Sequence, residues 1–94
     1  MKQPAVYIMA NYKNGAIYVG VTSNLEARNY QHKSGDNDGF TKHYGCTLLV
    51  WYEIHETMES AILREKQIKG GSRKKKLALI EKENREWNDL SGSW

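Results

Sequence analysis

The sequence has little cysteine and little proline, and it lacks a long hydrophobic run. Cys46 is the only cysteine among 94 residues, which excludes an internal disulfide and gives no reason to expect an oxidising compartment. No apolar run approaches the ~20 residues that a membrane-spanning helix needs, and the first residues do not form a secretion signal. The three histidines lack the spacing of a zinc site. These absences favour a cytoplasmic protein with no membrane segment and no structural zinc.

The composition predicts one globular domain. A hydrophobic content of 39% is typical of a folded chain and not of a disordered one, and a chain of this length supports one hydrophobic core. No linker and no internal repeat divides the sequence. Strand-like and helix-like patterns both occur, so we expect a single α+β domain over residues 1–94, with its core between about residues 5 and 90.

Residues 5–22 are predicted to form a β-hairpin, from which the rest of the fold is predicted. Two runs of alternating apolar residues are joined by Asn14-Gly15, a strong signal for a tight hairpin because both residues tolerate positive φ. A two-residue loop pairs Tyr7 with Thr22, whereas a four-residue loop keeps the same side chains on each face. The expected core face consists of Val6, Ile8, Ala10, Tyr12, Ile17, Val19 and Val21.

The second face of this hairpin carries two tyrosines. Tyr7 and Tyr18 share it with Gly20, whose missing side chain leaves room for something to approach the backbone. In the expected register the two tyrosines are four residues apart along the strands, roughly 13 Å. Their hydroxyl groups reach one phosphate only if the rings lean together or the sheet twists strongly. We predict that they do.

The next residues predict a short helix and a third strand. Ser23 and Glu26 match a capping box for a helix that ends at about Ser34, and Arg28 and His32 share one face of it. Residues 35–45 have the composition of a loop. Residues 47–54 are nearly continuous in apolar side chains, which predicts a strand buried on both faces and central in the sheet.

Two further helices follow, and each has a capping residue. Thr57 caps a helix that ends at Gly70-Gly71, and Ser72 caps the next one. The tail after Arg85 is expected to dock Trp87 and Leu90 and otherwise to fray.

Glu65 occupies the apolar stripe of the helix that Thr57 begins. Met58, Ala61, Ile62 and Ile68 form the rest of that stripe. A carboxylate turned inward needs a cation, a metal ion or water, since an unpaired buried charge is very costly. The ordinary alternative is an edge position, from which the carboxylate reaches out to Lys69.

Positive charge is concentrated between residues 64 and 76, where seven lysines and arginines stand against one glutamate. Such a cluster suits a polyanion such as nucleic acid, although many charge runs are only solvated faces. The first turn of the last helix is Arg73-Lys74-Lys75-Lys76. Cations there oppose the helix dipole, which suggests that an anion such as phosphate completes the site.

Six polar residues together indicate phosphodiester hydrolysis, which needs a base for water, a cation beside the phosphate and usually a metal ion. They are Tyr7, Tyr18, Arg28, His32, Glu65 and Asn84. Each also has an ordinary structural interpretation, as a strand aromatic, a surface residue or, for Asn84, a helix cap. A tyrosine with the reference pKa of about 10 is a poor base, so Arg28, His32 or a metal ion would have to lower that pKa.

The spacing of these residues resembles the GIY-YIG nuclease superfamily. Tyr7 stands within AVYI, and Tyr18-Val19-Gly20 follows eleven residues later. Arg28 comes ten residues after Tyr18, and Glu65 lies on the helix after the third strand. The stretches HKSG, GFTK, REKQIK and SRKKKLALIEK are similar to those of small stand-alone bacterial members. Ala5, Val6 and Val19 depart from the name motif only at backbone and core positions.

The resemblance implies a three-stranded antiparallel sheet flanked by helices, and a metal-dependent nuclease that acts on DNA, with RNA not excluded. Tyr7 or Tyr18 would assist removal of a proton from water, Arg28 would bind the phosphate, and Glu65 would bind Mg²⁺ or Mn²⁺. His32 would support the site by hydrogen bonding, and Asn84, or Asn88 nearby, would position phosphate. The expected nucleic-acid-binding residues are Lys42, Lys69, Arg73, Lys74, Lys75 and Lys76.

Two other functions are compatible with the sequence. A non-catalytic nucleic-acid-binding module would keep the basic residues but has no need of Glu65, and a protein-interaction domain would show no salt-sensitive DNA binding. A domain of this size has little room for a long base-specific reader, which favours structure-dependent or weakly specific cleavage. By analogy with stand-alone members we expect a DNA-repair role and a monomer or weak homodimer.

Overall fold

The computed structural model describes residues 3–34 and 44–93. The described residues form three strands, three α-helices and a final 3₁₀ helix. In chain order they are β1 (Ala5–Ala10), β2 (Ile17–Thr22), α1 (Leu25–Ser34), β3 (Leu48–Ile54), α3 (Met58–Gly70), α4 (Arg73–Glu83) and η1 (Leu90–Ser93). None of these helices is long and apolar enough to cross a membrane. Lys42 and most of the loop predicted over residues 35–45 lie outside the described residues.

The three strands form one antiparallel sheet in the order β2-β1-β3. This confirms the predicted fold class, but the prediction that residues 47–54 form the central strand is wrong. The central strand is β1, and each of its six residues is buried, whereas β3 is an edge strand that becomes exposed towards Ile54. The sequence AVYIMA is itself almost wholly apolar, as expected for a strand covered on both faces.

The hairpin register differs from the predicted one by two residues. Tyr7 pairs with Gly20 and Met9 with Tyr18, so the loop spans the four residues 12–15 in place of Asn14-Gly15 alone. Asn11 explains the longer loop, because its Oδ1 accepts hydrogen bonds from the backbone N–H groups of residues 12 and 16, at 2.8 and 2.9 Å. A shift of two leaves each side chain on its predicted face. Tyr12, however, lies in the loop and is 64% exposed, so its predicted core position is wrong.

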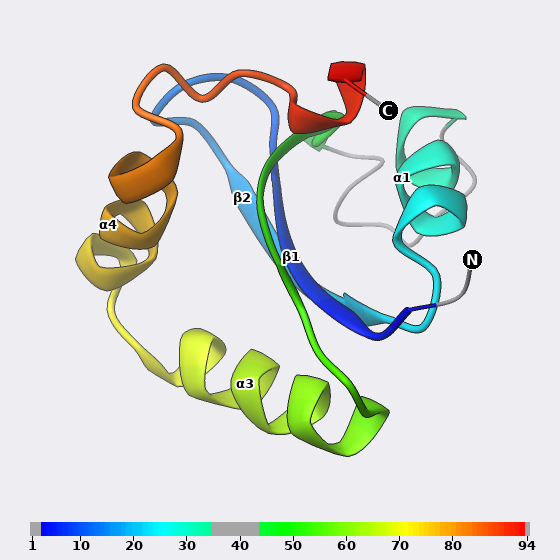
Figure 1. Cartoon of the computed structure of the whole chain (residues 1–94). Coiled ribbons are helices and arrows are strands. Elements are labelled where there is room, and N and C mark those ends of the chain that lie inside the picture. The colour runs from blue at the N-terminus through cyan, green and yellow to red at the C-terminus, as the bar shows by residue number, and fades with distance from the viewer. Residues whose placement is uncertain (1–2, 35–43, 94) are drawn as a thin grey trace.

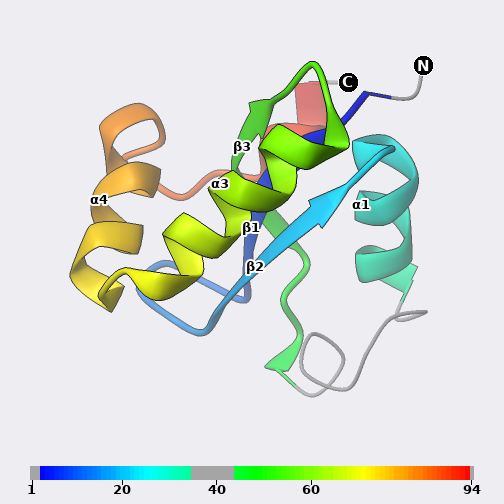
Figure 2. The ribbon, with the colours of Figure 1, turned by 90° about the horizontal axis from the view of Figure 1, so that it is seen from below.

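Helices cover both faces of the sheet. In Figure 1, α1 lies on one side of the strands, and α3 and α4 lie on the other. The core beneath α3 and α4 contains Val6, Ile8, Val19, Ala61, Ile68 and Ile80. The core on the α1 face contains Tyr7, Met9, Leu25, Cys46 and Leu49, with Tyr18 packed against it. Viewed from below, α3 crosses the sheet beside β2 (Figure 2), so β2 is the edge that both layers of helices approach.

A β-bulge at Val50 interrupts the pairing of β1 with β3. Ile8 pairs with Trp51 and Met9 with Leu49, which leaves Val50 as the extra residue. Val50 and Trp51 therefore both reach the core beneath α4 although they are consecutive. The backbone oxygen of Val50 accepts a hydrogen bond from Asn84 Nδ2 at 3.0 Å, so the end of α4 is fastened to the bulge.

Most of the predicted helix signals are confirmed. The hydroxyl of Thr57 accepts from the N–H of residue 60, and that of Ser72 accepts from the N–H of residue 75. Ser23 is not the cap of α1, because Asn24 Oδ1 accepts from the N–H of residue 27 and the helix begins at residue 25. An amide and a hydroxyl at neighbouring positions both suit an N-cap, so the pattern left the start uncertain by one residue. Trp87 is buried and Leu90 is partly buried, as predicted for the tail.

Candidate functional site

Tyr7, Tyr18 and His32 form one aromatic cluster on the α1 face of the sheet. The ring centroids of Tyr7 and Tyr18 are 6.3 Å apart, and each tyrosine ring lies 5.5 Å from the imidazole of His32. The hydroxyl of Tyr7 is hydrogen-bonded to His32 Nε2 at 3.0 Å. The prediction that the tyrosine rings come together is therefore correct, and the observed register explains it. With Tyr18 opposite Met9, the two tyrosines are offset by two residues and not by four.

The ring of Tyr7 packs directly against the backbone of Gly20. The two residues are paired across the strands, and a Cβ atom at position 20 would lie 2.5 Å from both Cζ and the hydroxyl oxygen of Tyr7. Real Cβ atoms do not approach other atoms so closely. The room that the sequence predicts beside Gly20 is thus occupied by the protein's own tyrosine. The result is a tyrosine that is fully buried and fixed from three sides.

Arg28 lies one helical turn before His32 on α1. Its side chain is half-buried, and within the part of the chain that the structure describes no carboxylate pairs with its guanidinium group. Its five N–H donors can bind a phosphate through two parallel hydrogen bonds. The spacing of four residues places Arg28 and His32 on the same face of α1, as predicted.

Glu65 forms an ion pair with Lys69, whose Nζ lies 3.3 Å from its Oε2. The Glu65 side chain is 15% exposed and that of Lys69 is 51% exposed. This is the ordinary pairing that the sequence also allows for an inward carboxylate. Lys69 also lines a surface hollow of about 290 Å³, so the ion pair lies next to that hollow.

This hollow connects α3 with the edge strand of the sheet. It is lined by Ile17, Tyr18 and Val19 of β2 and by Lys69 and Lys76. Tyr18 packs on the α1 face, whereas α3 covers the opposite face. The predicted site residues therefore lie on both faces of the sheet, and Tyr18 and Lys69, the ion-pair partner of Glu65, line the same hollow at β2.

The donor set near Glu65 suits only one kind of metal site. Within the described residues, no group of three or more His, Cys, Asp or Glu side chains could enclose a metal ion. Zinc sites need such a cage, but Mg²⁺ is bound through one or two carboxylates, several waters and the phosphates of the substrate. A single, partly exposed carboxylate beside a hollow fits Mg²⁺ or Mn²⁺ held jointly with substrate.

Asn84 does not join the tyrosine cluster. Its amide Nδ2 donates to the backbone oxygens of Val50 and Asn88 at 3.0 and 2.8 Å, and its Oδ1 accepts from the N–H of Asn88. Both amide hydrogens and the amide oxygen are thus used at the end of α4, beside β3. The side chain is buried. These contacts match the helix-cap interpretation of Asn84.

The predicted cationic residues are of two kinds. Arg73 donates to the backbone oxygens of Asn14 and Gly15 in the hairpin loop, at 3.1 and 2.6 Å. Lys76 donates to the backbone oxygen of Gly71 at 2.8 Å, at the end of α3. These two side chains bind backbone, whereas Lys74 and Lys75 are exposed.

Two cations that sequence reasoning missed are Arg64 and Lys82. Both line a hollow between α3 and α4 together with Lys75. Lys75 and Lys82 are seven residues apart, which places them on one face of a helix. That spacing indicates that Lys75 and Lys82 share a face, but the basic cluster in the sequence ends at Lys76 and does not include Lys82.

Cys46 is a buried residue of the core on the α1 face. Burial raises the pKa of its thiol, which disfavours the nucleophilic thiolate form.

Comparison with known proteins agrees with the fold. A family model described as the GIY-YIG catalytic domain matches residues 3–78. The chain is 37% identical over 81 residues to a UPF0213 protein of Staphylococcus haemolyticus, covering 86% of this chain and 98% of the relative. A UPF0213 protein of Staphylococcus saprophyticus is 36% identical, with 85% and 96% covered. The solution NMR structure of a UPF0213 protein from Bacillus halodurans is similar at a TM-score of 0.55 and 30% identity, covering 87% of this chain and 86% of that one.

Proposed function

The chain belongs to the GIY-YIG catalytic domain family, a nuclease family, and on that premise we propose that it is a metal-dependent endonuclease that hydrolyses phosphodiester bonds in DNA. The observation that carries the proposal is the contact of the Tyr7, Tyr18 and His32 rings. Lys69, the ion-pair partner of Glu65, lines a hollow together with Tyr18. Cleavage would be structure-dependent or weakly sequence-specific, because the domain has little surface for reading bases.

Tyr18 is the tyrosine that would act on the attacking water. It is partly exposed and lies on the edge strand at the hollow, whereas Tyr7 is fully buried. In this assignment a deprotonated Tyr18 oxygen would accept one proton from water, and the resulting hydroxide would attack phosphorus. The bond from phosphorus to the leaving oxygen would break, and that oxygen would depart with the electron pair and take a proton from solvent water.

Tyr7 and His32 would act as positioning residues. Their mutual hydrogen bond, together with the contact of Tyr7 with Gly20, holds both rings against Tyr18. A reacting group held in one geometry loses less freedom on reaching the transition state. Arg28, on the same helix as His32, would bind the non-bridging oxygens of the phosphate and stabilise the charge that develops on them.

Glu65 would hold a divalent cation, which supplies positive charge at the leaving oxygen of the substrate. Lys69 neutralises this carboxylate in the structure, and its side chain would instead turn towards the phosphate if Glu65 held the cation. The change needs only a lysine side chain that is half exposed, so it requires no movement of α3.

The Glu65–Lys69 ion pair also supports a second candidate function, a nucleic-acid-binding module without catalysis. In that protein Lys69 permanently neutralises Glu65, and the basic residues alone bind the polyanion. The two functions differ in whether the protein cleaves DNA and needs the Glu65 carboxylate to do so.

The deciding experiment measures nicking of supercoiled plasmid and cutting of a branched DNA, with Mg²⁺ or with chelator. Wild type, Glu65→Gln and Glu59→Gln are compared at matched concentration. Glu59 is the control because it lies on α3, is exposed and undergoes the same change of charge. If the protein is the proposed endonuclease, wild type and Glu59→Gln cut both DNA substrates in the presence of Mg²⁺. Chelator abolishes this cutting, and Glu65→Gln does not cut.

Two other results would contradict this proposal, the first at the role of Glu65 and the second at cleavage itself. Equal cutting by wild type and Glu65→Gln would mean that Glu65 does not act in the chemistry or that a contaminant cuts. Salt-dependent binding by all three proteins without any cutting would favour the binding module.

A further inference from the structure

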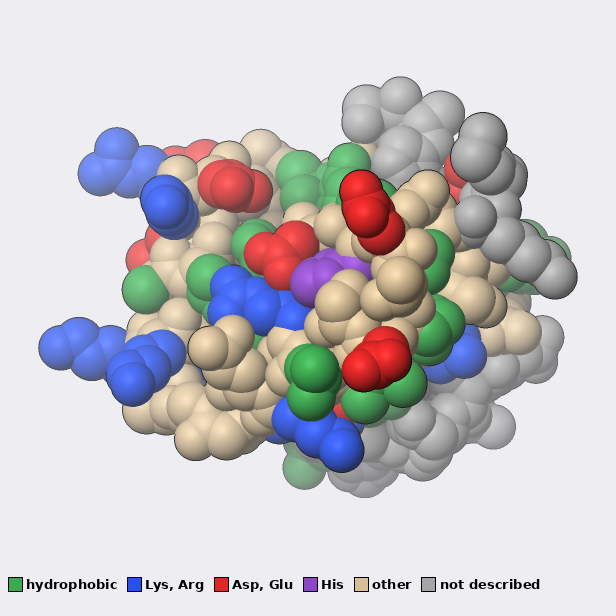
Figure 3. Space-filling view, turned by 60° about the horizontal axis from the view of Figure 1, so that its bottom comes forward, with side chains coloured by type: hydrophobic (Ala, Val, Ile, Leu, Met, Phe, Trp, Pro, Cys, Tyr) green, Lys and Arg blue, Asp and Glu red, His purple; other side chains and the backbone are tan. Residues whose placement is uncertain are grey.

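A hollow of about 520 Å³ separates α3 from α4. Its wall carries four cations, Arg64, Lys75, Lys76 and Lys82, and its floor includes Ile68 and Leu79. No aspartate or glutamate lines it. Figure 3 shows lysine and arginine side chains projecting at the left of the molecule, where α4 and the end of α3 lie. A hollow with this lining is complementary to an anion that also has an apolar surface.

The cations of this hollow are available to a ligand. Within the described residues, the side chains of Lys75 and Lys82 make no hydrogen bond and no ion pair. Lys76 Nζ donates to the backbone oxygens of Gly71 at 2.8 Å and Lys69 at 3.4 Å, and an ammonium has three donors. Each of these lysines therefore keeps at least one donor for a ligand.

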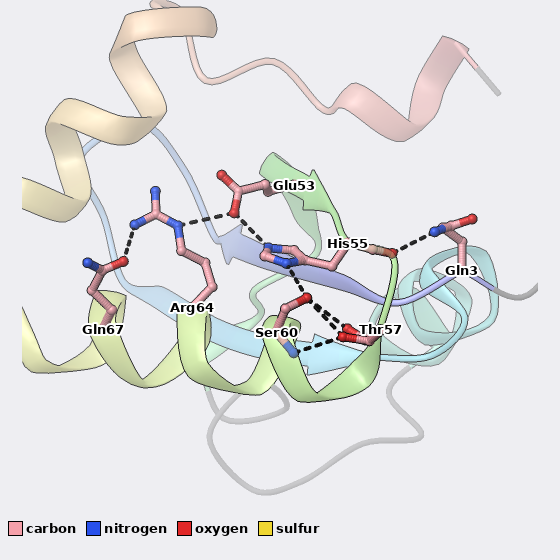
Figure 4. Close-up of polar contacts among 7 residues, drawn as sticks. All are labelled: Gln3, Glu53, His55, Thr57, Ser60, Arg64 and Gln67. Atoms are coloured by element: carbon pink, nitrogen blue, oxygen red, sulfur yellow. Dashed lines mark hydrogen bonds and ion pairs between the residues drawn. The ribbon is translucent and has the colours of Figure 1, made fainter.

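Arg64 is held in place by three neighbours, two of which appear in Figure 4. Its Nε donates to Glu53 at 3.1 Å, and its Nη1 donates to Gln67 at 2.5 Å. Its guanidinium carbon also lies 6.0 Å from the centroid of the Trp51 ring. Glu53 in turn accepts from His55 Nε2 at 2.7 Å. A cation fixed in this way loses little freedom when it binds an anion.

Lys76 joins this hollow to the proposed cleavage site. It lines the hollow between α3 and α4, and it also lines the smaller hollow that contains Tyr18 and Lys69. The two hollows thus share a basic lining residue between the edge of β2 and Lys82. The next hollow is also lined by Arg64 and Lys82, but it contains Glu53 and Glu83 as well. The lining therefore changes from basic to mixed charge at Arg64 and Lys82.

We propose that the hollow between α3 and α4 binds a single-stranded segment of DNA that flanks the cleaved phosphate. This inference rests on the proposed function, and it names the form of the substrate. The strand would run from Tyr18 past Lys69 and Lys76, and its phosphates would lie against Lys75, Lys82 and Arg64.

Single-stranded DNA fits this hollow better than a duplex. Base faces are exposed in a single strand and can pack on an apolar floor, whereas in a duplex they are stacked inside. Ile68 and Leu79 supply that floor between the cations. A substrate that combines a junction with a single-stranded tail would use both the cleavage site and the hollow.

The test measures binding by fluorescence anisotropy, without divalent metal so that no cleavage occurs. The probes are labelled single-stranded and duplex oligonucleotides of equal length, over a series of salt concentrations. Wild type is compared with Lys75→Gln/Lys82→Gln and with the control Lys66→Gln/Arg85→Gln. The control also removes two exposed positive charges, and neither residue lines the hollow.

The proposal expects the Lys75→Gln/Lys82→Gln protein to bind the single strand on the order of tenfold more weakly at low salt. The slope of log affinity against log salt should fall by about 1.4, because each phosphate contact on a single strand contributes about 0.7. Duplex binding should change less, and the control should bind both probes nearly as wild type does. Circular dichroism confirms that each variant is folded.

Equal weakening by the two double variants would overturn the proposal, since the effect would then be one of net charge. Equal weakening for single strand and duplex would overturn the assignment of a single strand. If wild type cuts DNA while Lys75→Gln/Lys82→Gln binds normally, the inference fails and the nuclease stands. If no protein cuts but the expected binding pattern appears, the nuclease fails and the binding site stands.

Discussion

The ring of Tyr7 occupies the space that a side chain at Gly20 would need. The two residues face each other across β1 and β2, and a Cβ at position 20 would lie 2.5 Å from the Tyr7 hydroxyl oxygen. The aromatic cluster of the proposed site thus depends on a residue that has no functional group. This dependence can be tested without touching any polar side chain.

Gly20→Ala should displace the Tyr7 ring and break its hydrogen bond to His32. Forcing a methyl group into a filled space costs about 1–3 kcal/mol of unfolding free energy, and cleavage should fall with the loss of the cluster. Urea unfolding and the nicking assay measure the two effects.

Gly70→Ala is the matched control for this substitution. A Cβ at position 70 meets nothing within 4 Å, and the residue ends α3. Its stability should be unchanged or slightly raised, since alanine favours a helix. Wild-type stability and cleavage in Gly20→Ala would contradict the packing described for Tyr7.

Removing the two tyrosine hydroxyls should separate stability from catalysis. Tyr7→Phe leaves buried His32 without that hydrogen bond, so the unfolding free energy should fall by about 1–3 kcal/mol. Tyr18→Phe, at a partly exposed position, should leave stability nearly unchanged but reduce cleavage by roughly 100-fold or more if Tyr18 assists proton removal. Thermal melts and single-turnover cleavage rates distinguish the two substitutions. Greater loss of cleavage in Tyr7→Phe, with unchanged stability, would exchange the two assignments.

Asn84→Ala should destabilise the protein because it removes the side-chain hydrogen bond that joins the end of α4 to the bulge. The backbone oxygen of Val50 would lose its amide partner, and the expected cost is roughly 1–3 kcal/mol. The control is Asn88→Ala, because Asn88 is exposed and contributes only backbone atoms to this contact.

Cleavage at low temperature shows whether Asn84 has a further role. If Asn84 is only structural, the folded Asn84→Ala protein should cut as wild type does. Lost cleavage with an unchanged melting temperature would instead assign Asn84 to the site.

Asp89 should make stability depend on acid pH. Burial raises the pKa of its carboxyl group, but hydrogen bonds from Lys33 and Ser91, together with the charge of Lys33, outweigh burial and hold that pKa below its usual value. A pKa that is lower in the folded state stabilises the protein above the unfolded pKa of about 3.8. This stabilisation is lost as the pH falls through the folded pKa.

The measurement is urea unfolding of wild type and Asp89→Asn between pH 7 and pH 2.5. The substitution removes the ion pair with Lys33, so the variant should be less stable than wild type by about 1–2 kcal/mol at pH 7 and pH 5. The difference should shrink below about pH 4. A difference that stays constant down to pH 2.5 would show that the Asp89 charge contributes nothing.

Local patterns predicted most of the elements because local physics determines them. The third strand was predicted over residues 47–54 and is found over Leu48–Ile54. The helix capped by Thr57 ends at Gly70 as predicted. Alternation also placed Tyr7, Tyr18 and Gly20 on one face, and that result survives a register shift of two residues.

The errors arose where a tertiary contact decides between local alternatives. Asn11 closes the hairpin with its side chain, and no apolar pattern reveals that. β1 became the central strand because β3 returned to its free edge, which depends on the path of the chain and not on either strand alone. The sequence allowed Glu65 either a metal ion or a pairing with Lys69, and the structure has the pairing. Only the fold shows that Lys69 also lines a hollow with Tyr18.

The burial of β1 on both faces changes how a loss of activity in this family would be recognised. Tyr7 is at once part of a hydrophobic core and part of the proposed site, so Tyr7, Gly20 and His32 would still contribute to packing in a relative that abandons catalysis. Glu65 and Arg28 are under no such constraint, since neither is fully buried. A tyrosine motif without that carboxylate and guanidinium would therefore be the remnant of an enzyme, kept for its architecture alone.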